Sequence, residues 1–206
     1  TRVRSSAASD VYKRQVHVLF LGQGILSRPG STPEDLADLR KRAQRANDVL
    51  GVSTLAFEEF PDNRLDSVDR LSLVRCVEAF LEKHRPGTVY THLAIDLNVD
   101  HVRAHESVIT ACRPLPQSPV RSLLLFEIPS STGWRSSAPA FAPNWFVDVT
   151  KTAETKLRAL REYGDEVRAF PHARSLESIE ALLRWRGASV GVAAAEAFEV
   201  ARRIVD

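Results

Sequence analysis

Apolar residues recur along this chain at two alternating spacings, which predicts an alternation of strands and helices. A β-branched and apolar run at 16–21 ends at Gly22 and predicts a buried strand. The stretch that ends at Leu50 has apolar residues at helical spacing. It opens on cap-forming residues, a proline and acids, and Gly51 follows it, as is typical of a helix. The same patterns predict strands at 52–57, 88–92, 123–128 and 145–149, and helices at 67–84, 102–112, 152–163 and 176–185.

This order of elements predicts an α/β protein with a mostly parallel sheet covered by helices on both faces. With 206 residues, of which 44% are hydrophobic, the chain is long enough for one domain with a sizeable core. The Ser-, Pro- and Ala-rich stretch 129–143 predicts a loop over the site, because loops of this length are often functional. No internal repeat and no linker indicates a second domain.

Charge and cysteine content exclude several classes of function. The formal net charge is +2, and no cluster of Lys and Arg is interleaved with aromatic residues, so a nucleic-acid partner is not expected. No apolar run is long enough to cross a membrane, and no secretory leader is recognisable. The cysteines, Cys76 and Cys112, lie on apolar helical faces, which predicts buried free thiols. A cytoplasmic location fits these features best.

The segment Asp96-Leu97-Asn98-Val99-Asp100-His101 carries the strongest chemical signal. It lies where a predicted strand gives way to a predicted helix, at the carboxyl edge of the sheet. A carboxylate beside an imidazole can present a metal ligand there. The same pattern is also typical of a helix cap beside a solvated histidine, and the six residues alone leave both interpretations open.

The wider segment 96–114, DLNVDHVRAHESVITACRP, resembles the zinc-dependent N-deacetylases of the PIG-L/LmbE-like family. Several linked motifs in the family's order make this resemblance specific. It implies a Rossmann-like three-layer αβα sandwich, a Zn²⁺ cofactor, and removal of acetyl from a small-molecule N-acetylated amino-sugar conjugate of the N-acetylglucosamine type. The further matches are PDNRLD at 61–66, EIPSST at 127–132, FAPNWFVDVT at 141–150 and GVAAAEAF at 191–198.

The resemblance also implies roles for single residues. His101 is implied as a zinc ligand and Asp100 as a carboxylate that shapes the site beside it. Asn98 stands where some relatives have a histidine that polarises the amide carbonyl, and an amide donates a hydrogen bond but supplies no proton. His92 ends a strand at the same edge. It is expected either to reach the pocket or to be a core-edge histidine bonded to backbone.

Two further residues are implied to bind the sugar hydroxyls. Arg28 follows the first recognisable strand, and Asp62 follows Pro61. An arginine donates in a fork and a carboxylate accepts from neighbouring hydroxyls, so both residue types suit this role. The alternatives are an ordinary surface charge for Arg28 and a turn-forming residue for Asp62.

The start of the chain departs from the family pattern. The family's His-Pro-Asp-Asp motif, which supplies two zinc ligands and the general base, is expected upstream of Val16 and is absent. Residues 1–15, TRVRSSAASDVYKRQ, are basic and rich in Ser and Ala. We therefore expect a non-native leader at 1–15, followed by a deacetylase domain at 16–206 that lacks its first strand and first helix and is inactive as given. A native disordered tail is the alternative for 1–15.

A function of another class stays open beside the hydrolase. It is a non-catalytic sugar- or nucleotide-binding module on a Rossmann-like fold. No G-x-G-x-x-G motif follows any predicted strand, which counts against a dinucleotide site. The sequence does not settle the aglycone of the substrate or whether the protein forms a homo-oligomer.

Overall fold

The computed structural model describes residues 15–134 and 139–205, and these fall into two compact units. The first unit consists of 15–20, Arg28–Ala56 and Phe146–Ala197. The second consists of Leu21–Ser27 and the described parts of 57–145 and 198–206. Residues 1–14 of the predicted leader and 135–138 of the predicted loop lie outside the described residues. The assignment of 16–206 to one deacetylase domain stays a prediction.

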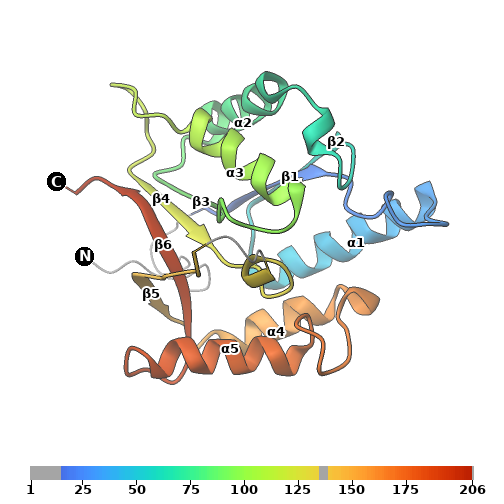
Figure 1. The fold of residues 1–206 in the computed structure, drawn as a ribbon, viewed down its shortest axis with the longest axis vertical. Coiled ribbons are helices and arrows are strands. Elements are labelled where there is room, and N and C mark those ends of the chain that lie inside the picture. Colours follow the sequence, from blue (N-terminus) through green and yellow to red (C-terminus); the bar gives the residue numbers. More distant parts are fainter. Residues whose placement is uncertain (1–14, 135–138, 206) are drawn as a thin grey trace. The chain divides into compact units, whose positions relative to one another are not determined.

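Strands and helices alternate along most of the chain, which confirms the α/β class (Figure 1). The strands are β1 (His17–Gly22), β2 (Thr54–Phe60), β3 (Thr88–His92), β4 (Ser122–Phe126), β5 (Trp145–Asp148) and β6 (Ala195–Arg203). The α-helices are α1 (Pro33–Leu50), α2 (Arg70–His84), α3 (Val99–Ala111), α4 (Ala153–Arg161) and α5 (Leu176–Ala188). Short 3-10 turns are η2 (Leu65–Ser67), η3 (Thr132–Trp134) and η4 (Gly164–Glu166).

The predicted mostly parallel sheet is wrong. The described strands form a two-stranded sheet, β1-β2, and a four-stranded sheet in the order β3-β4-β6-β5. β3 and β4 are parallel, whereas β4 and β6 are antiparallel. Strand β6 was not predicted from the sequence, and it introduces the antiparallel pair. Mixed sheets of this kind are common in α/β proteins, and the three-layer arrangement stays a prediction.

In the first unit, helix α4 packs against both α1 and α5. Helix α1 begins with a capping box, in which Thr32 and Asp35 bond each other's backbone N–H. It ends at Gly51, whose φ of 71° is the left-handed conformation that glycine adopts without strain. Figure 1 shows α4 and α5 side by side at the bottom of the view.

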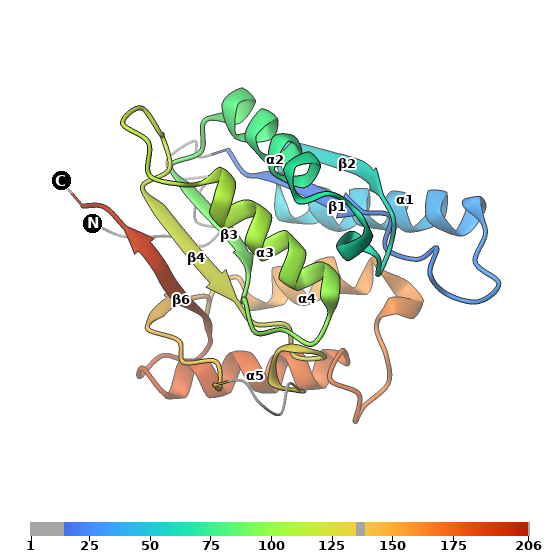
Figure 2. The same ribbon diagram turned by 45° about the horizontal axis from the view of Figure 1, so that its top comes forward.

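In the second unit, α2 and α3 pack together and α3 also packs on β3 (Figure 2). Cys112, Val120 and Leu123 form a buried cluster at the end of α3 and the start of β4. Both cysteines are free thiols, Cys112 fully buried and Cys76 half-buried, and burial raises the pKa of each to about 11. No helix within 15–134 or 139–205 has the length and apolarity needed to span a bilayer.

Gly187 allows the chain after α5 to fold back closely on that helix. A Cβ at this position would lie 2.6 Å from the Val192 carbonyl oxygen and 2.8 Å from the Ala194 Cα. Both are backbone atoms, so relief requires the return segment to move. We predict that Gly187→Ala lowers the free energy of unfolding by about 1–3 kcal/mol, the usual cost of overpacking. Denaturant titration measures it.

Gly87→Ala is the matched control, because no heavy atom lies within 4 Å of its added Cβ. Its effect on the unfolding free energy should stay within about 0.5 kcal/mol. Equal losses in the two variants would contradict the close approach at Gly187.

Candidate functional site

The candidate site lies where β3 ends and α3 begins, within the second unit (Figure 2). Asn98 is the N-cap of α3, and its side-chain oxygen accepts from the backbone N–H of Asp100 at 2.8 Å and of His101 at 3.4 Å. The predicted helix cap in this segment therefore exists, but an amide forms it. The cap places the first turn of α3, and with it His101, directly after the loop that follows β3.

Asp96 is the most buried polar residue of this loop. Only 1% of it is exposed. Its carboxylate accepts from the Asn98 backbone N–H at 2.8 Å, from Ser131 Oγ at 3.0 Å and from Thr132 Oγ1 at 2.8 Å. Burial alone would raise the pKa of Asp96, but these hydrogen bonds favour the charged form and bring the pKa below its ordinary value. Asp96 is therefore a buried, ionised carboxylate that accepts three hydrogen bonds.

Asp96 orients His101. The Nδ1 atom of His101 lies 3.0 Å from Asp96 Oδ1, and Ser131 Oγ lies 3.4 Å from the same nitrogen. A carboxylate at Nδ1 fixes the tautomer that carries its proton there, which leaves the Nε2 lone pair available to a metal or a reacting proton. No role for Asp96 was predicted from the sequence. The signal that could have indicated one is the hydroxyl-rich EIPSST segment, which supplies the Ser131 and Thr132 donors.

His92 stacks on a face of the same His101 imidazole. The rings of His92 and His101 are stacked, with centroids 4.4 Å apart and an angle of 15° between their planes. The carbonyl oxygen of His92 lies 2.8 Å from His105 Nδ1. Burial first, and then the neighbouring His101, lower the pKa of His92 to about 3, so its ring is neutral. His92 thus packs on His101.

Asp100 holds the loop that precedes η2. Its carboxylate accepts from the backbone N–H of Asn63 at 2.6 Å and of Leu65 at 2.9 Å. Burial raises the pKa of Asp100, and these two bonds offset only part of that rise. Its position beside His101 in the sequence therefore does not make it the partner of that imidazole.

Asp62 is linked to Asn98 by a chain of hydrogen bonds. Asp62 Oδ2 accepts from both the backbone N–H and the hydroxyl of Ser27, at 3.1 and 2.6 Å. Asn63 Nδ2 donates to Ser27 Oγ at 2.9 Å, and Asn98 Nδ2 donates to Asn63 Oδ1 at 3.1 Å. The second unit therefore brings together five of the predicted site residues: Asp62, His92, Asn98, Asp100 and His101.

Arg28 belongs to the first unit, where it forms a two-pronged ion pair. Its Nη1 and Nη2 donate to the two carboxylate oxygens of Glu166 at 2.5 and 2.8 Å. Arg174 Nη1 also donates to Glu166, at 3.2 Å. The hydrogen bond from Arg28 is the main reason that the pKa of Glu166 lies below its ordinary value. Glu166 was not anticipated from the sequence, which offers no pattern that pairs residues so far apart.

The metal-ligating residues of the described chain do not form a metal centre on their own. No group of three or more His, Cys, Asp or Glu side chains suited to a metal ion occurs within 15–134 and 139–205. The carboxylate of Asp100 is engaged with backbone, and Asp96 faces Nδ1 of His101. His101 Nε2 is therefore a single ligand position, whereas catalytic zinc requires three protein ligands.

A protein-family model described as PIG-L, GlcNAc-PI de-N-acetylase, matches residues 6–112, just over half of the chain. The match begins inside the predicted leader at 1–15, whose separate status stays a prediction. No curated protein matches the chain.

Solved structures share the fold over nearly the whole chain. N,N′-diacetylchitobiose deacetylase from Pyrococcus horikoshii matches with a TM-score of 0.75 and 18% identity, over 96% of this chain and 76% of that one. The conserved protein TT1542 from Thermus thermophilus gives 0.74 and 22%, over 98% and 88%. The 4-carboxy-2-hydroxymuconate hydratase from Pseudomonas putida gives 0.74 and 18%, over 98% and 90%. At these identities the likeness concerns the fold alone.

Replacing Asp96 tests whether it sets the tautomer of His101. Asp96→Asn keeps the size of the side chain but removes the carboxylate that faces Nδ1. We predict that the His101 proton then distributes over both ring nitrogens. The protein also loses about 1–3 kcal/mol of unfolding free energy through disrupted buried hydrogen bonds. Nitrogen-15 NMR of the imidazole rings reports the tautomer.

Asp100→Asn is the contrasting variant. Asp100 bonds the backbone of Asn63 and Leu65, so its loss should destabilise the loop and leave the His101 tautomer unchanged. An unaltered tautomer in Asp96→Asn would contradict the orienting role of Asp96.

The ion pair of Glu166 predicts a pH dependence of stability. Because the folded-state pKa of Glu166 is lowered, its contribution is present above the unfolded value of about 4.3 and is lost as the pH falls through the folded value. Glu166→Gln should therefore lower the unfolding free energy at pH 7 by about 1 kcal/mol, kept small by solvent screening. The deficit should vanish in acid. Denaturant titrations between pH 7 and pH 2 measure it.

Glu82→Gln is the control for this pH dependence, since Glu82 is exposed on α2 and forms no ion pair within the described residues. A deficit in Glu166→Gln that persists unchanged in acid would show that charge is not its cause.

Proposed function

This chain belongs to the PIG-L family, and from that membership we propose that its function is hydrolytic N-deacetylation of an amino-sugar conjugate. The substrate class is an N-acetylglucosamine-type sugar on an aglycone of unspecified chemistry. In the reaction, water adds to the carbonyl carbon of the acetyl group, the amide C–N bond breaks, and acetate and a free amine are released. A cytoplasmic location stays a prediction, and a homo-oligomeric state stays open as an alternative.

The observation that carries this proposal is the Asp96–His101 pair. A buried carboxylate lies 3.0 Å from one ring nitrogen of His101, so the other nitrogen is the one suited to bind a ligand. His101 itself lies in the first turn of α3, shortly after β3 ends. Ligand sites of open α/β sheets lie at the carboxyl ends of the strands. The neutral His92 ring supports the same imidazole from one face, so His101 is held in one orientation before any substrate arrives.

Asn98 and Asp62 are proposed to contact the substrate. One N–H of the Asn98 amide donates to Asn63, and the other is suited to donate to the oxygen of the acetyl carbonyl. The Ser27 bonds of Asp62 both use Oδ2, so Oδ1 is suited to accept from a sugar hydroxyl. The contact of Arg28 with a sugar hydroxyl stays a prediction, because Arg28 lies in the first unit and its guanidinium pairs with Glu166.

The resemblance to this family implies zinc, but the described residues do not fit a complete zinc site. They supply His101 as a ligand and Asp96 as the carboxylate that orients it, with no third group of the kind that zinc requires. We therefore propose that the chain binds zinc weakly. A submicromolar dissociation constant for zinc in the purified chain would contradict this.

The alternative is a non-catalytic sugar-binding module. The single imidazole position favours it, because a binding site needs the hydrogen-bonding network of Asp62, Asn63 and Asn98 but no complete metal centre. The two functions differ in product. A binding module takes up an N-acetylated sugar and releases no amine, whatever metal is added.

The deciding experiment is an assay of amine and acetate release by the purified chain with zinc added. We predict release from N-acetylglucosamine conjugates, its abolition by His101→Ala, and an approximately 10–100-fold loss in Asp96→Asn, as is usual for a residue that orients a metal ligand.

His84→Ala is the control, because it removes another imidazole of the second unit, one that packs on Phe80. It should leave turnover unchanged. Near-normal turnover in His101→Ala would remove that residue from the chemistry, and binding without any product in the wild-type protein would favour the alternative.

A further inference from the structure

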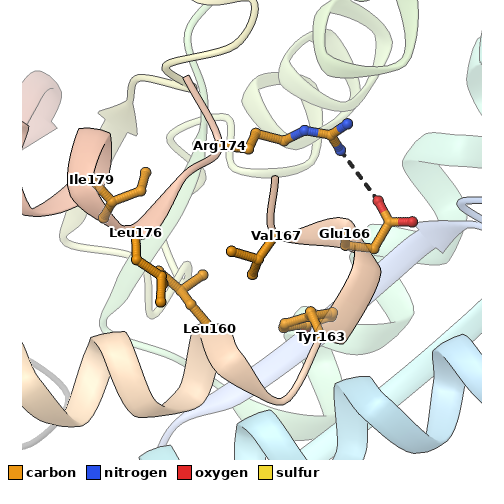
Figure 3. Close-up of a pocket in the computed structure, with 7 residues that line it drawn as sticks. All are labelled: Leu160, Tyr163, Glu166, Val167, Arg174, Leu176 and Ile179. Atoms are coloured by element: carbon orange, nitrogen blue, oxygen red, sulfur yellow. Dashed lines mark hydrogen bonds and ion pairs between the residues drawn. The ribbon is translucent and has the colours of Figure 1, made fainter. Parts of the chain in front are cut away.

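The first unit contains a cavity of about 170 Å³ that the proposed deacetylase chemistry does not use. It lies among the end of α4, the η4 turn and the start of α5. Figure 3 shows the side chains of Leu160, Val167, Leu176 and Ile179 converging on it, with Tyr163 beside them. Arg174 and Glu166 lie on one side and contact each other.

The size and walls of this cavity suit a compact apolar group. A cavity of about 150 Å³ lined by Leu, Ile and Phe in an engineered protein stays dry and binds benzene. The walls here are formed by aliphatic side chains and a tyrosine ring. A six-membered ring or a branched alkyl group of similar volume therefore fits this space.

The charged side of the cavity favours an anion. Arg28 and Arg174 both donate to Glu166, so Arg174 shares that carboxylate with a second guanidinium. The Arg174 side chain is 41% exposed, and its Nε is buried with no hydrogen-bond partner among the described residues. Since a guanidinium has five N–H donors, Arg174 retains donors for a second carboxylate.

The backbone of Arg174 is held in place. Its N–H donates to His172 Nδ1 at 3.0 Å, and its carbonyl accepts from the Arg168 N–H at 3.4 Å. The next residue, Ser175, is fully buried and caps α5 by accepting from the Ser178 N–H. Because its backbone is anchored, only the Arg174 side chain has to be ordered when a ligand binds, which limits the entropic cost of binding.

We propose that this cavity binds a small carboxylate with a ring or branched alkyl body, the body among the aliphatic walls and the carboxylate on Arg174. This is a second ligand site, which lies within the first unit, and it does not depend on the proposed deacetylase function. The competing explanation is a loosely packed part of the core, which would show no preference for an anion.

Methyl NMR of the wild-type chain, titrated with benzoate and with benzyl alcohol, tests the proposal directly. Benzoate should shift the methyl signals of Val167, Leu176 and Ile179 in a saturable manner. Benzyl alcohol, which has the same ring without the charge, should bind about tenfold more weakly or worse, because it lacks the charge-assisted bonds. Acetate, which has the charge without the ring, should produce no saturable shift at these methyls.

Two variants and a matched control separate charge from shape. Arg174→Gln should weaken benzoate binding about tenfold and leave benzyl alcohol unaffected. Val167→Phe should fill the cavity and abolish the binding of both. Arg161→Gln is the control, because Arg161 is a half-exposed guanidinium of α4 paired with Glu154, and it should bind benzoate as the wild type does.

Several results would overturn the proposal. They are equal binding of benzoate and benzyl alcohol, shifts that do not saturate or that lie elsewhere, and equal losses in Arg161→Gln and Arg174→Gln. The wild-type methyl titration decides even if Val167→Phe does not fold, and none of these results depends on whether the protein releases acetate.

Discussion

The carboxylate of Asp96 is removed from water at the end of β3, and the arrangement of the candidate site depends on how that charge is satisfied. An ionised carboxyl group with 1% exposure is stable only if hydrogen bonds replace its hydration. The hydroxyls of Ser131 and Thr132 and the Asn98 N–H supply them. Because these donors come from the loop after β4 and from the start of α3, the charge ties those segments together. His101 contacts the same carboxylate.

Much of the local structure was predictable because it depends on short-range chemistry. Strand β3 has the predicted bounds, and α1 ends at the glycine that the sequence indicated. Helix α3 begins at Val99, three residues before the predicted start, because Asn98 caps it. Strand β6 was missed, since its Ala- and Glu-rich sequence has helical propensity and only pairing with β4 makes it a strand.

The roles of the two acids in the 96–101 segment illustrate what a sequence leaves open. Adjacent residues of a helix do not face each other, so Asp100 cannot be the partner of His101 merely because it precedes it. Asp96 lies in the loop before α3, and the chain folds back there to bring it to Nδ1. The Arg28–Glu166 pair was beyond prediction for a related reason, because it joins residues 138 positions apart.

The fold and the family carry different weight in assigning chemistry. A deacetylase and a hydratase match this chain with nearly equal TM-scores, so the fold supports more than one reaction and does not identify the one performed here. The side chains are more specific. Within one segment of six residues, hydrogen bonds keep the pKa of Asp96 low despite burial, whereas burial prevails at Asp100 and raises its pKa. The first carboxylate therefore orients an imidazole, and the second holds the loop that contains Asn63. Because only one of the two acids contacts an imidazole, and that imidazole is His101, the proposed chemistry centres on His101.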